Sequence, residues 1–220
     1  MQSTRTEGHA ENAATSRRSN MDVKKFFIGV FILCIIGFFY LFFFIGETYL
    51  YEIPVHLGFF SAAMYFLWKR NLKTTIKSLG IPGKFWNNVK FICAGFFSII
   101  ITLFAINIIA NYLEINDQSA VVDIVQQLPL YILIMAVLFA PISEEIFFRA
   151  FLVSKIGVLG SSVVFALLHI SYGSVIELIG AFSIGLILAL IYKHSKSIVP
   201  PIAIHMGYNL IAISVMLGFG

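Results

Sequence analysis

Long apolar runs separated by short polar segments extend along most of the 220-residue chain. A helix that rises about 1.5 Å per residue needs about 20 mostly apolar residues to cross a hydrocarbon core about 30 Å thick. The pattern therefore predicts an all-α fold, a polytopic transmembrane helix bundle with about seven spans, within a range of about six to eight. The predicted spans are residues 26–45, 49–68, 89–112, 128–149, 159–171, 174–192 and 198–219.

The N-terminal segment differs from the rest of the chain. Residues 1–20 are polar and lack apolar periodicity, which predicts a disordered tail, with Met21 as a candidate native start. The apolar run at 26–45 is too long for a signal peptide and lacks a small-x-small cleavage site after it, so we expect a retained span. Residues 21–220 are predicted to form one membrane-embedded domain.

The composition supports the membrane assignment, because 59% of the residues are hydrophobic and 12% are charged, against about 25% charged residues in soluble domains. The net charge of +4 does not indicate a nucleic-acid partner, since the basic residues lie in short loops beside the spans. Cys34 and Cys93 fall in separate apolar runs without metal-type spacing, so we expect neither a disulfide nor a cysteine metal site. The predicted surroundings are the lipid bilayer. The sequence gives no oligomeric state.

Charges in the loops predict the orientation of the chain. Alternate loops carry only acidic residues near the spans, namely Glu47, Glu52, Glu114, Asp117, Asp123 and Glu177. The basic residues fall in the other loops, at Lys24, Lys25, Lys69, Arg70, Lys73, Lys77, Lys84, Lys155, Lys193 and Lys196. Because basic residues collect on the cytoplasmic side, we expect a multi-pass cell-membrane protein with a cytoplasmic N-terminus.

A few ionisable residues lie within the apolar runs, where a charged side chain costs about 2.5–3.5 kcal/mol on insertion. Helical spacing places Glu145 and Arg149 on one face, and likewise His205 and Asn209. Helical rise places Glu145, His169 and His205 each about 14–15 Å from the cytoplasmic boundary. We therefore expect these helices to bring their polar groups to one level. His56, near Glu52, is interpreted instead as an interhelical hydrogen-bond donor.

This set of residue types suits hydrolysis of a carbonyl compound. A buried carboxylate beside neutral imidazoles can hold and deprotonate a water molecule. The amide of Asn209, together with His205, can donate to a developing oxyanion. The sequence contains no H-E-x-x-H, no G-x-S-G and no Asp within the spans, so the other intramembrane protease chemistries find little support.

Three motifs make the resemblance specific: Glu144-Glu145-Ile-Phe-Phe-Arg149, Phe165-Ala-Leu-Leu-His169 and His205-Met-Gly-Tyr-Asn209. In this order they resemble the E-E-x-x-x-R, F-x-x-x-H and H-x-x-x-N motifs of the CAAX protease and bacteriocin-processing family, also called type II CAAX prenyl endopeptidase-like. The resemblance covers a catalytic core at about residues 128–219. It implies that Glu144 and His169 activate water, that His205 and Asn209 stabilise the oxyanion, and that Glu145 and Arg149 support them.

The family resemblance also guides the expected substrate and cofactor. It implies cleavage of a membrane-associated peptide or protein, with access from the cytoplasmic half and no required cofactor. The Phe- and Ile-rich, Lys-over-Arg composition favours a bacterial source, and hence a propeptide, pheromone precursor or bacteriocin rather than a prenylated protein. A catalytic zinc held by Glu144, His169 and His205 is the metal-dependent alternative.

Other interpretations of the same residues remain open. Glu145 and Arg149 form a buried pair that by itself would only stabilise the bundle. The alternative to an enzyme is a non-catalytic bacteriocin self-immunity or scaffold protein, or a small proton-coupled transporter with Glu144, His169 and His205 as a proton relay. A transporter would be favoured by an inverted repeat or by broken helices in both halves, and the sequence shows neither.

Overall fold

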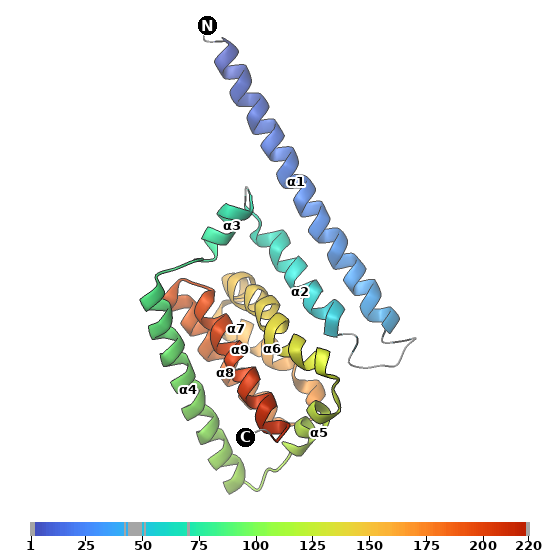
Figure 1. Ribbon diagram of the computed structural model, residues 1–220, viewed down its shortest axis with the longest axis vertical. Coiled ribbons are helices and arrows are strands. Elements are labelled where there is room, and N and C mark those ends of the chain that lie inside the picture. Colours follow the sequence, from blue (N-terminus) through green and yellow to red (C-terminus); the bar gives the residue numbers. More distant parts are fainter. Residues whose placement is uncertain (1–2, 42, 44–49, 51, 70, 219–220) are drawn as a thin grey trace. The chain divides into compact units, whose positions relative to one another are not determined.

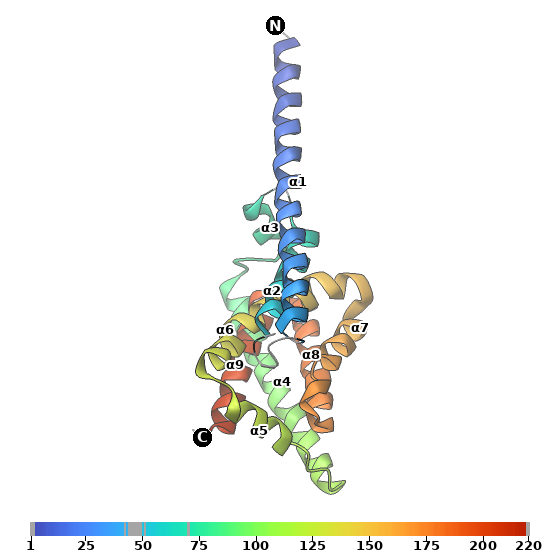
Figure 2. The same ribbon diagram turned by 90° about the vertical axis from the view of Figure 1, so that its right-hand side faces the viewer.

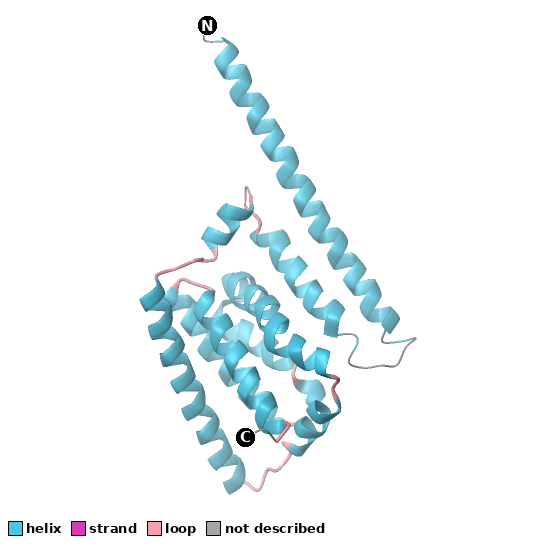
Figure 3. Cartoon of the chain, viewed as in Figure 1, coloured by secondary structure: helices cyan, strands magenta, loops and turns pink. Residues whose placement is uncertain are grey.

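The structure is a computed structural model that describes residues 3–41, 43, 50, 52–69 and 71–218. These residues form helices joined by short loops, without a strand among them, which confirms the all-α prediction (Figure 3). The chain divides into two compact units, Met1–Leu79 and Gly80–Gly220, where the sequence predicts one membrane domain from residue 21. Part of the first predicted loop, including Glu47, and the loop residue Arg70 lie outside the described residues.

The first unit contains α1 (Ser3–Tyr40), α2 (Glu52–Leu67) and the short α3 (Leu72–Ser78) (Figure 1). From Ser3 onward, the segment predicted to be a disordered tail is the beginning of α1, since its Ala, Glu and Arg residues favour helix and continue into the apolar run. On α2, His56 Nε2 lies 3.4 Å from Glu52 Oε2, so His56 has a partner on its own helix.

The second unit holds all the motif residues. Its elements are α4 (Phe85–Tyr112), α5 (Ser119–Gln127), α6 (Leu130–Glu145), the π-helix η3 (Ile146–Leu152), α7 (Val153–Leu167), the 3-10 helix η4 (Ile170–Tyr172), α8 (Val175–Ser195) and α9 (Val199–Met216). Helices α4, α8 and α9 lie side by side (Figure 1, Figure 2). Ile99 of α4, Leu188 of α8 and Ile204 of α9 form a fully apolar core between them.

Five segments of the described chain are long and apolar enough to cross a membrane. They are Asn12–Tyr40, Phe85–Tyr112, Leu130–Tyr172, Val175–Ser195 and Val199–Met216. Helix α2 is apolar but has only 16 residues. The chain therefore has the features of a multi-pass membrane protein, although the predicted number of about seven spans is not confirmed by helix length alone.

A close approach of α7 and α8 brings their motif residues toward α9. A Cβ at Gly185 would lie 3.2 Å from Phe165 Cδ1 and 3.4 Å from Ser162 Cα, so a larger residue would require the Phe165 ring to shift by a few tenths of an ångström. The Phe165 ring centroid lies 5.9 Å from that of His205 on α9. Gly185 therefore helps to set the distance between the second and third motifs.

We expect Gly185→Ala to destabilise the protein relative to Gly180→Ala on the same helix. The added methyl at Gly185 crowds the Phe165 ring of α7 and costs about 1–3 kcal/mol through overpacking. At Gly180 it makes an ordinary 3.6 Å contact with Leu103 Cδ2 and gains up to about 1 kcal/mol of helix propensity. Thermal unfolding in detergent compares the two variants. Equal unfolding temperatures would contradict this account of the α7–α8 contact.

Candidate active site

The first motif lies where α6 changes geometry. Pro141, inside α6, lacks the N–H that would bond the preceding turn, and five residues later the π-helix η3 begins. Such wide turns are frequent at functional sites. The Ser161 hydroxyl of α7 donates a 2.8 Å hydrogen bond to the Phe148 carbonyl, which supports η3 from outside. Glu144, Glu145 and Arg149 therefore project from an irregular but internally supported part of the helix.

Glu145 lies at the centre of a buried group of charged side chains. Its Oε2 is 2.8 Å from Arg149 Nε, and both side chains are completely buried. Its Oε1 is 2.9 Å from Nδ1 of His205. A carboxylate paired with a guanidinium accepts hydrogen bonds, so the proton of this bond lies on Nδ1. Both oxygens of Glu145 are thus engaged, one by its own helix and one by α9.

Glu144 lies on the other side of the His205 ring. Its Oε2 is 3.8 Å from His205 Nε2, and its side chain is 14% exposed, whereas that of Glu145 is 0% exposed. His205 therefore lies between the two carboxylates of the first motif. Of these two carboxylates, Glu144 is the one that solvent reaches.

Aromatic rings surround the guanidinium of Arg149. Its Cζ lies 4.7 Å from the Phe165 ring centroid and 5.8 Å from that of Phe148, distances that fit cation–π contacts. Nη1 and Nη2 find no hydrogen-bond acceptor among the described residues. The positive charge is thus stabilised mainly by Glu145 and by the ring faces.

His169 joins this group through Phe165 rather than through a carboxylate of the first motif. Its Nδ1 lies 3.0 Å from the Phe165 carbonyl, and the two ring centroids are 4.9 Å apart. Because a carbonyl accepts, Nδ1 donates, which leaves Nε2 as the nitrogen available to a substrate. The Phe165 ring therefore contacts His169, His205 and Arg149 at once.

Asn209 has a structural partner in this arrangement. Its Nδ2 donates a 2.9 Å hydrogen bond to the Ala136 carbonyl of α6, just before the turn disturbed by Pro141. The sequence predicts Asn209 as an oxyanion donor, a task that is left to its second N–H. The observed bond ties α9 to α6 one helical turn from His205.

The pattern of charges in the loops predicts that Glu177 lies in a loop between two spans. Glu177 instead lies half-buried in the first turn of α8 and interacts electrostatically with His169 and with Tyr208 of α9. The signal for this placement was present, because Ser174 and Glu177 have the S-x-x-E spacing of a helix start. The second unit therefore presents a third carboxylate beside the motif histidines.

The three candidate zinc ligands, Glu144, His169 and His205, are not gathered into one metal-binding group in the described part of the chain. No other group of three His, Cys, Asp or Glu side chains among the described residues is placed to hold a metal ion. His205 uses Nδ1 for Glu145, and Nδ1 of His169 faces a carbonyl, so each ring keeps Nε2 for a further partner. The alternative of a zinc held by Glu144, His169 and His205 stays a prediction.

The fold and site define a helical membrane protein with a buried carboxylate, guanidinium and imidazole centre. Residues 126–211 match the family model described as type II CAAX prenyl endopeptidase Rce1-like. This match contains all six candidate residues, confirms the resemblance seen in the three motifs and indicates CAAX-type intramembrane protease activity. Neither the curated proteins nor the solved structures include a significant match to the chain.

We expect Arg149→Met to destabilise the protein by about 3–5 kcal/mol, because it leaves the Glu145 carboxylate buried without its counter-ion. The double variant Glu145→Gln/Arg149→Met removes the uncompensated charge and should recover a large part of this loss. Lys155→Met, at an exposed position of α7, is the matched control and should change little. Unfolding in detergent measures all three. Purely additive losses in the double variant would contradict the buried pair.

Proposed function

We propose that the protein is an intramembrane endopeptidase that hydrolyses a peptide bond of a membrane-associated peptide or propeptide by Glu144-activated water. The observation that carries the proposal is the contrast between two adjacent carboxylates. Glu145 is fully buried and engaged by Arg149 and His205, whereas Glu144 is partly exposed beside the same imidazole. A general base must reach both water and substrate, and Glu144 meets that requirement.

The proposed reaction has two steps. Glu144 takes a proton from water while the water oxygen attacks the scissile carbonyl carbon, which forms a tetrahedral oxyanion. Glu144 then passes this proton to the amide nitrogen as the C–N bond breaks, giving a carboxylic acid and an amine. His205 and the second N–H of Asn209 are the proposed donors to the oxyanion, and His169 is proposed to help Glu144 hold the attacking water.

Glu145 and Arg149 support this chemistry without touching the substrate. The bond from His205 Nδ1 to Glu145 fixes the ring so that Nε2 faces the side of Glu144. Arg149 pairs with the other oxygen of Glu145 at 2.8 Å and so holds the carboxylate in place to accept from that ring. A small rotation of His205 would misplace Nε2, so this support is part of the proposed catalytic arrangement.

The proposed topology has seven spans and a cytoplasmic N-terminus. The 43-residue segment Leu130–Tyr172 would be about 65 Å long as one straight helix, twice the hydrocarbon thickness. Gly157 interrupts it with φ 77° and ψ 178°, a conformation outside the helical region. Division at Gly157 yields two membrane segments, and α2 adds a further short one.

Single cysteines test this topology in a Cys34→Ser/Cys93→Ser background. Lys155→Cys and Lys196→Cys should react with a membrane-impermeant maleimide only in inverted vesicles, and Glu114→Cys only in intact cells. Labelling of positions 155 and 196 from opposite sides would contradict the division at Gly157. Labelling of all three positions from the reverse sides would overturn only the orientation.

The proposed substrate is a membrane-associated propeptide, pheromone precursor or bacteriocin of a bacterium, reached from the cytoplasmic half of the bilayer. The proposed reaction uses no cofactor. Cleavage assays in proteoliposomes should include such propeptides, together with a farnesylated CAAX peptide and its unprenylated form. This panel separates the proposed bacterial substrates from the prenylated substrates named in the family description.

Glu144→Gln should lower kcat by at least about 100-fold, because it removes the general base while keeping the side-chain shape. Glu114→Gln, in an exposed loop, is the matched control and should cleave like the wild type.

A chelator should have no effect on cleavage by the wild type. Inhibition by a chelator would favour zinc, and full activity of Glu144→Gln would refute the proposed base. Protection of cells from a bacteriocin by Glu144→Gln, without cleavage, would favour the immunity protein instead.

A further inference from the structure

The loop between α4 and α5 supplies an acidic cap for α8. Asp117 Oδ1 accepts a 2.7 Å hydrogen bond from the Ser174 hydroxyl and a 3.4 Å bond from the Ile176 N–H. Asp117 Oδ2 accepts a 2.5 Å bond from the Val175 N–H. The Ser174 oxygen in turn accepts a 3.0 Å bond from the Glu177 N–H. The first N–H groups of α8 thus all have acceptors, where a helix start normally leaves them without intrahelical partners.

Electrostatics favour this contact while Asp117 is ionised. The hydrogen bond from Ser174, followed by those from the Val175 and Ile176 N–H groups, holds the pKa of Asp117 below its ordinary value despite some desolvation. A lowered carboxyl pKa means that the cap is fully present above the usual Asp range and is lost as pH falls through the lowered value. At neutral pH the negative charge also lies at the favourable end of the α8 dipole.

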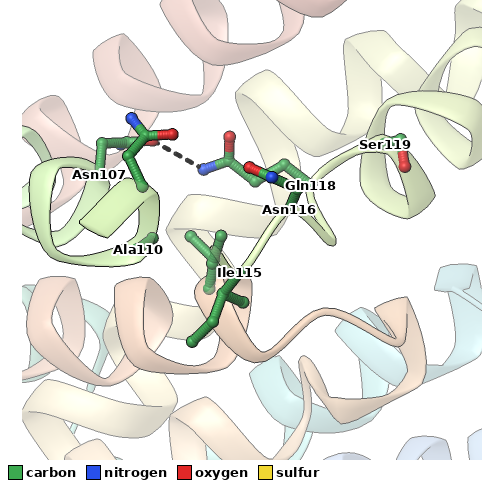
Figure 4. A pocket seen from close by; sticks show the side chains of 8 residues that line it. Asn107, Ala110, Ile115, Asn116, Gln118 and Ser119 are labelled. Atoms are coloured by element: carbon green, nitrogen blue, oxygen red, sulfur yellow. Dashed lines mark hydrogen bonds between the residues drawn. The ribbon is translucent and has the colours of Figure 1, made fainter. Parts of the chain in front are cut away.

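The capping loop is itself attached to α4. Gln118, next to Asp117, donates a 3.1 Å hydrogen bond from Nε2 to Asn107 Oδ1 of α4 (Figure 4). These two amides line a small pocket whose wall includes Ile176 of α8. Asp117 is therefore held between α4 and the start of α8.

The segment that carries His169 ends at this cap. Only the short η4 turn and Gly173 separate His169 from Ser174. Tyr172 of that turn packs against the cluster of Val121, Val125 and Leu133, and its ring centroid is 5.9 Å from that of His169. On the far side of the cap, one turn into α8, Glu177 interacts electrostatically with His169.

We propose that Asp117 is a positioning residue for His169, acting through the N-terminus of α8. By fixing Ser174, Val175 and Ile176, it holds the η4 turn and keeps Glu177 beside the imidazole. The effect of Asp117 on catalysis rests on the proposed function. Its effect on the position of His169 does not.

The test uses the full-length protein in nanodiscs with ¹⁵N-labelled histidine side chains. Wild type is compared with Asp117→Asn, Asp117→Glu, Ser174→Ala and the control Asp123→Asn, which alters an exposed acid of α5. His169→Gln assigns the His169 signal, and the exposed His194 is the internal reference. Hydrogen exchange at Val175 and Ile176 reports the cap directly.

In Asp117→Asn we expect exchange at Val175 and Ile176 to become about fivefold faster, as for a lost cap of about 1 kcal/mol. The His169 imidazole signals should shift or broaden, while His194 and the whole Asp123→Asn spectrum stay as in wild type. Asp117→Glu, which restores the charge, should return the His169 signals toward wild type. Where a cleaved peptide is known, kcat should fall with KM unchanged.

Faster exchange at α8 with an unchanged His169 signal would overturn the proposal, since Asp117 would then only cap a helix. Equal changes in Asp123→Asn would overturn it as well. If Asp117→Asn does not fold, Ser174→Ala takes its place in the same comparison, because it removes the two hydrogen bonds that the Ser174 hydroxyl makes in the cap. Altered His169 signals in a chain that cleaves no peptide would support the positioning role while contradicting the proposed function.

Discussion

The ion pair between Glu145 and Arg149 is the interaction on which the arrangement of the second unit depends. Two charges at full burial lose most of their hydration, so each requires a close partner of opposite sign. The π-helical turn η3 presents Arg149 to Glu145, and the rings of Phe148 and Phe165 enclose the guanidinium. The remaining oxygen of Glu145 attracts His205, which brings α9 against α6. One charged pair thus places residues from all three motifs around a common centre.

The two neighbouring glutamates have different environments because consecutive residues on a helix point in directions about 100° apart. Glu145 points into the protein and is enclosed by Arg149 and His205, whereas Glu144 points to the other side of the same imidazole and remains partly exposed. A buried, engaged carboxylate suits a supporting role, and an accessible one beside a histidine suits proton transfer. The family resemblance assigns the base to Glu144, and the structural contrast supports the same choice on independent grounds.

Hydropathy and four-residue spacing predicted much of this architecture. They predicted the all-α membrane class and the Glu145–Arg149 pair, because both depend on residues close together in sequence. They did not predict the bonds from His205 to Glu145, from Asn209 to Ala136 or from α8 to Asp117, since these depend on how distant helices are rotated about their axes. They also did not predict that the helix is interrupted at Gly157 and again by η4, on either side of the stretch that leads to His169. The helical course of α1 through residues 3–20 was also missed, because a polar segment without apolar periodicity is compatible with helix or disorder.

The central claim is that Glu145 holds the centre together while Glu144 is kept available for chemistry. The most direct test is thermal unfolding of Glu144→Gln and Glu145→Gln, measured side by side in the same detergent and requiring no substrate. The account predicts a large fall in unfolding temperature for Glu145→Gln, because Arg149 loses its counter-ion, and a value close to wild type for Glu144→Gln. Equal falls in both variants, or a larger fall for Glu144→Gln, would contradict it.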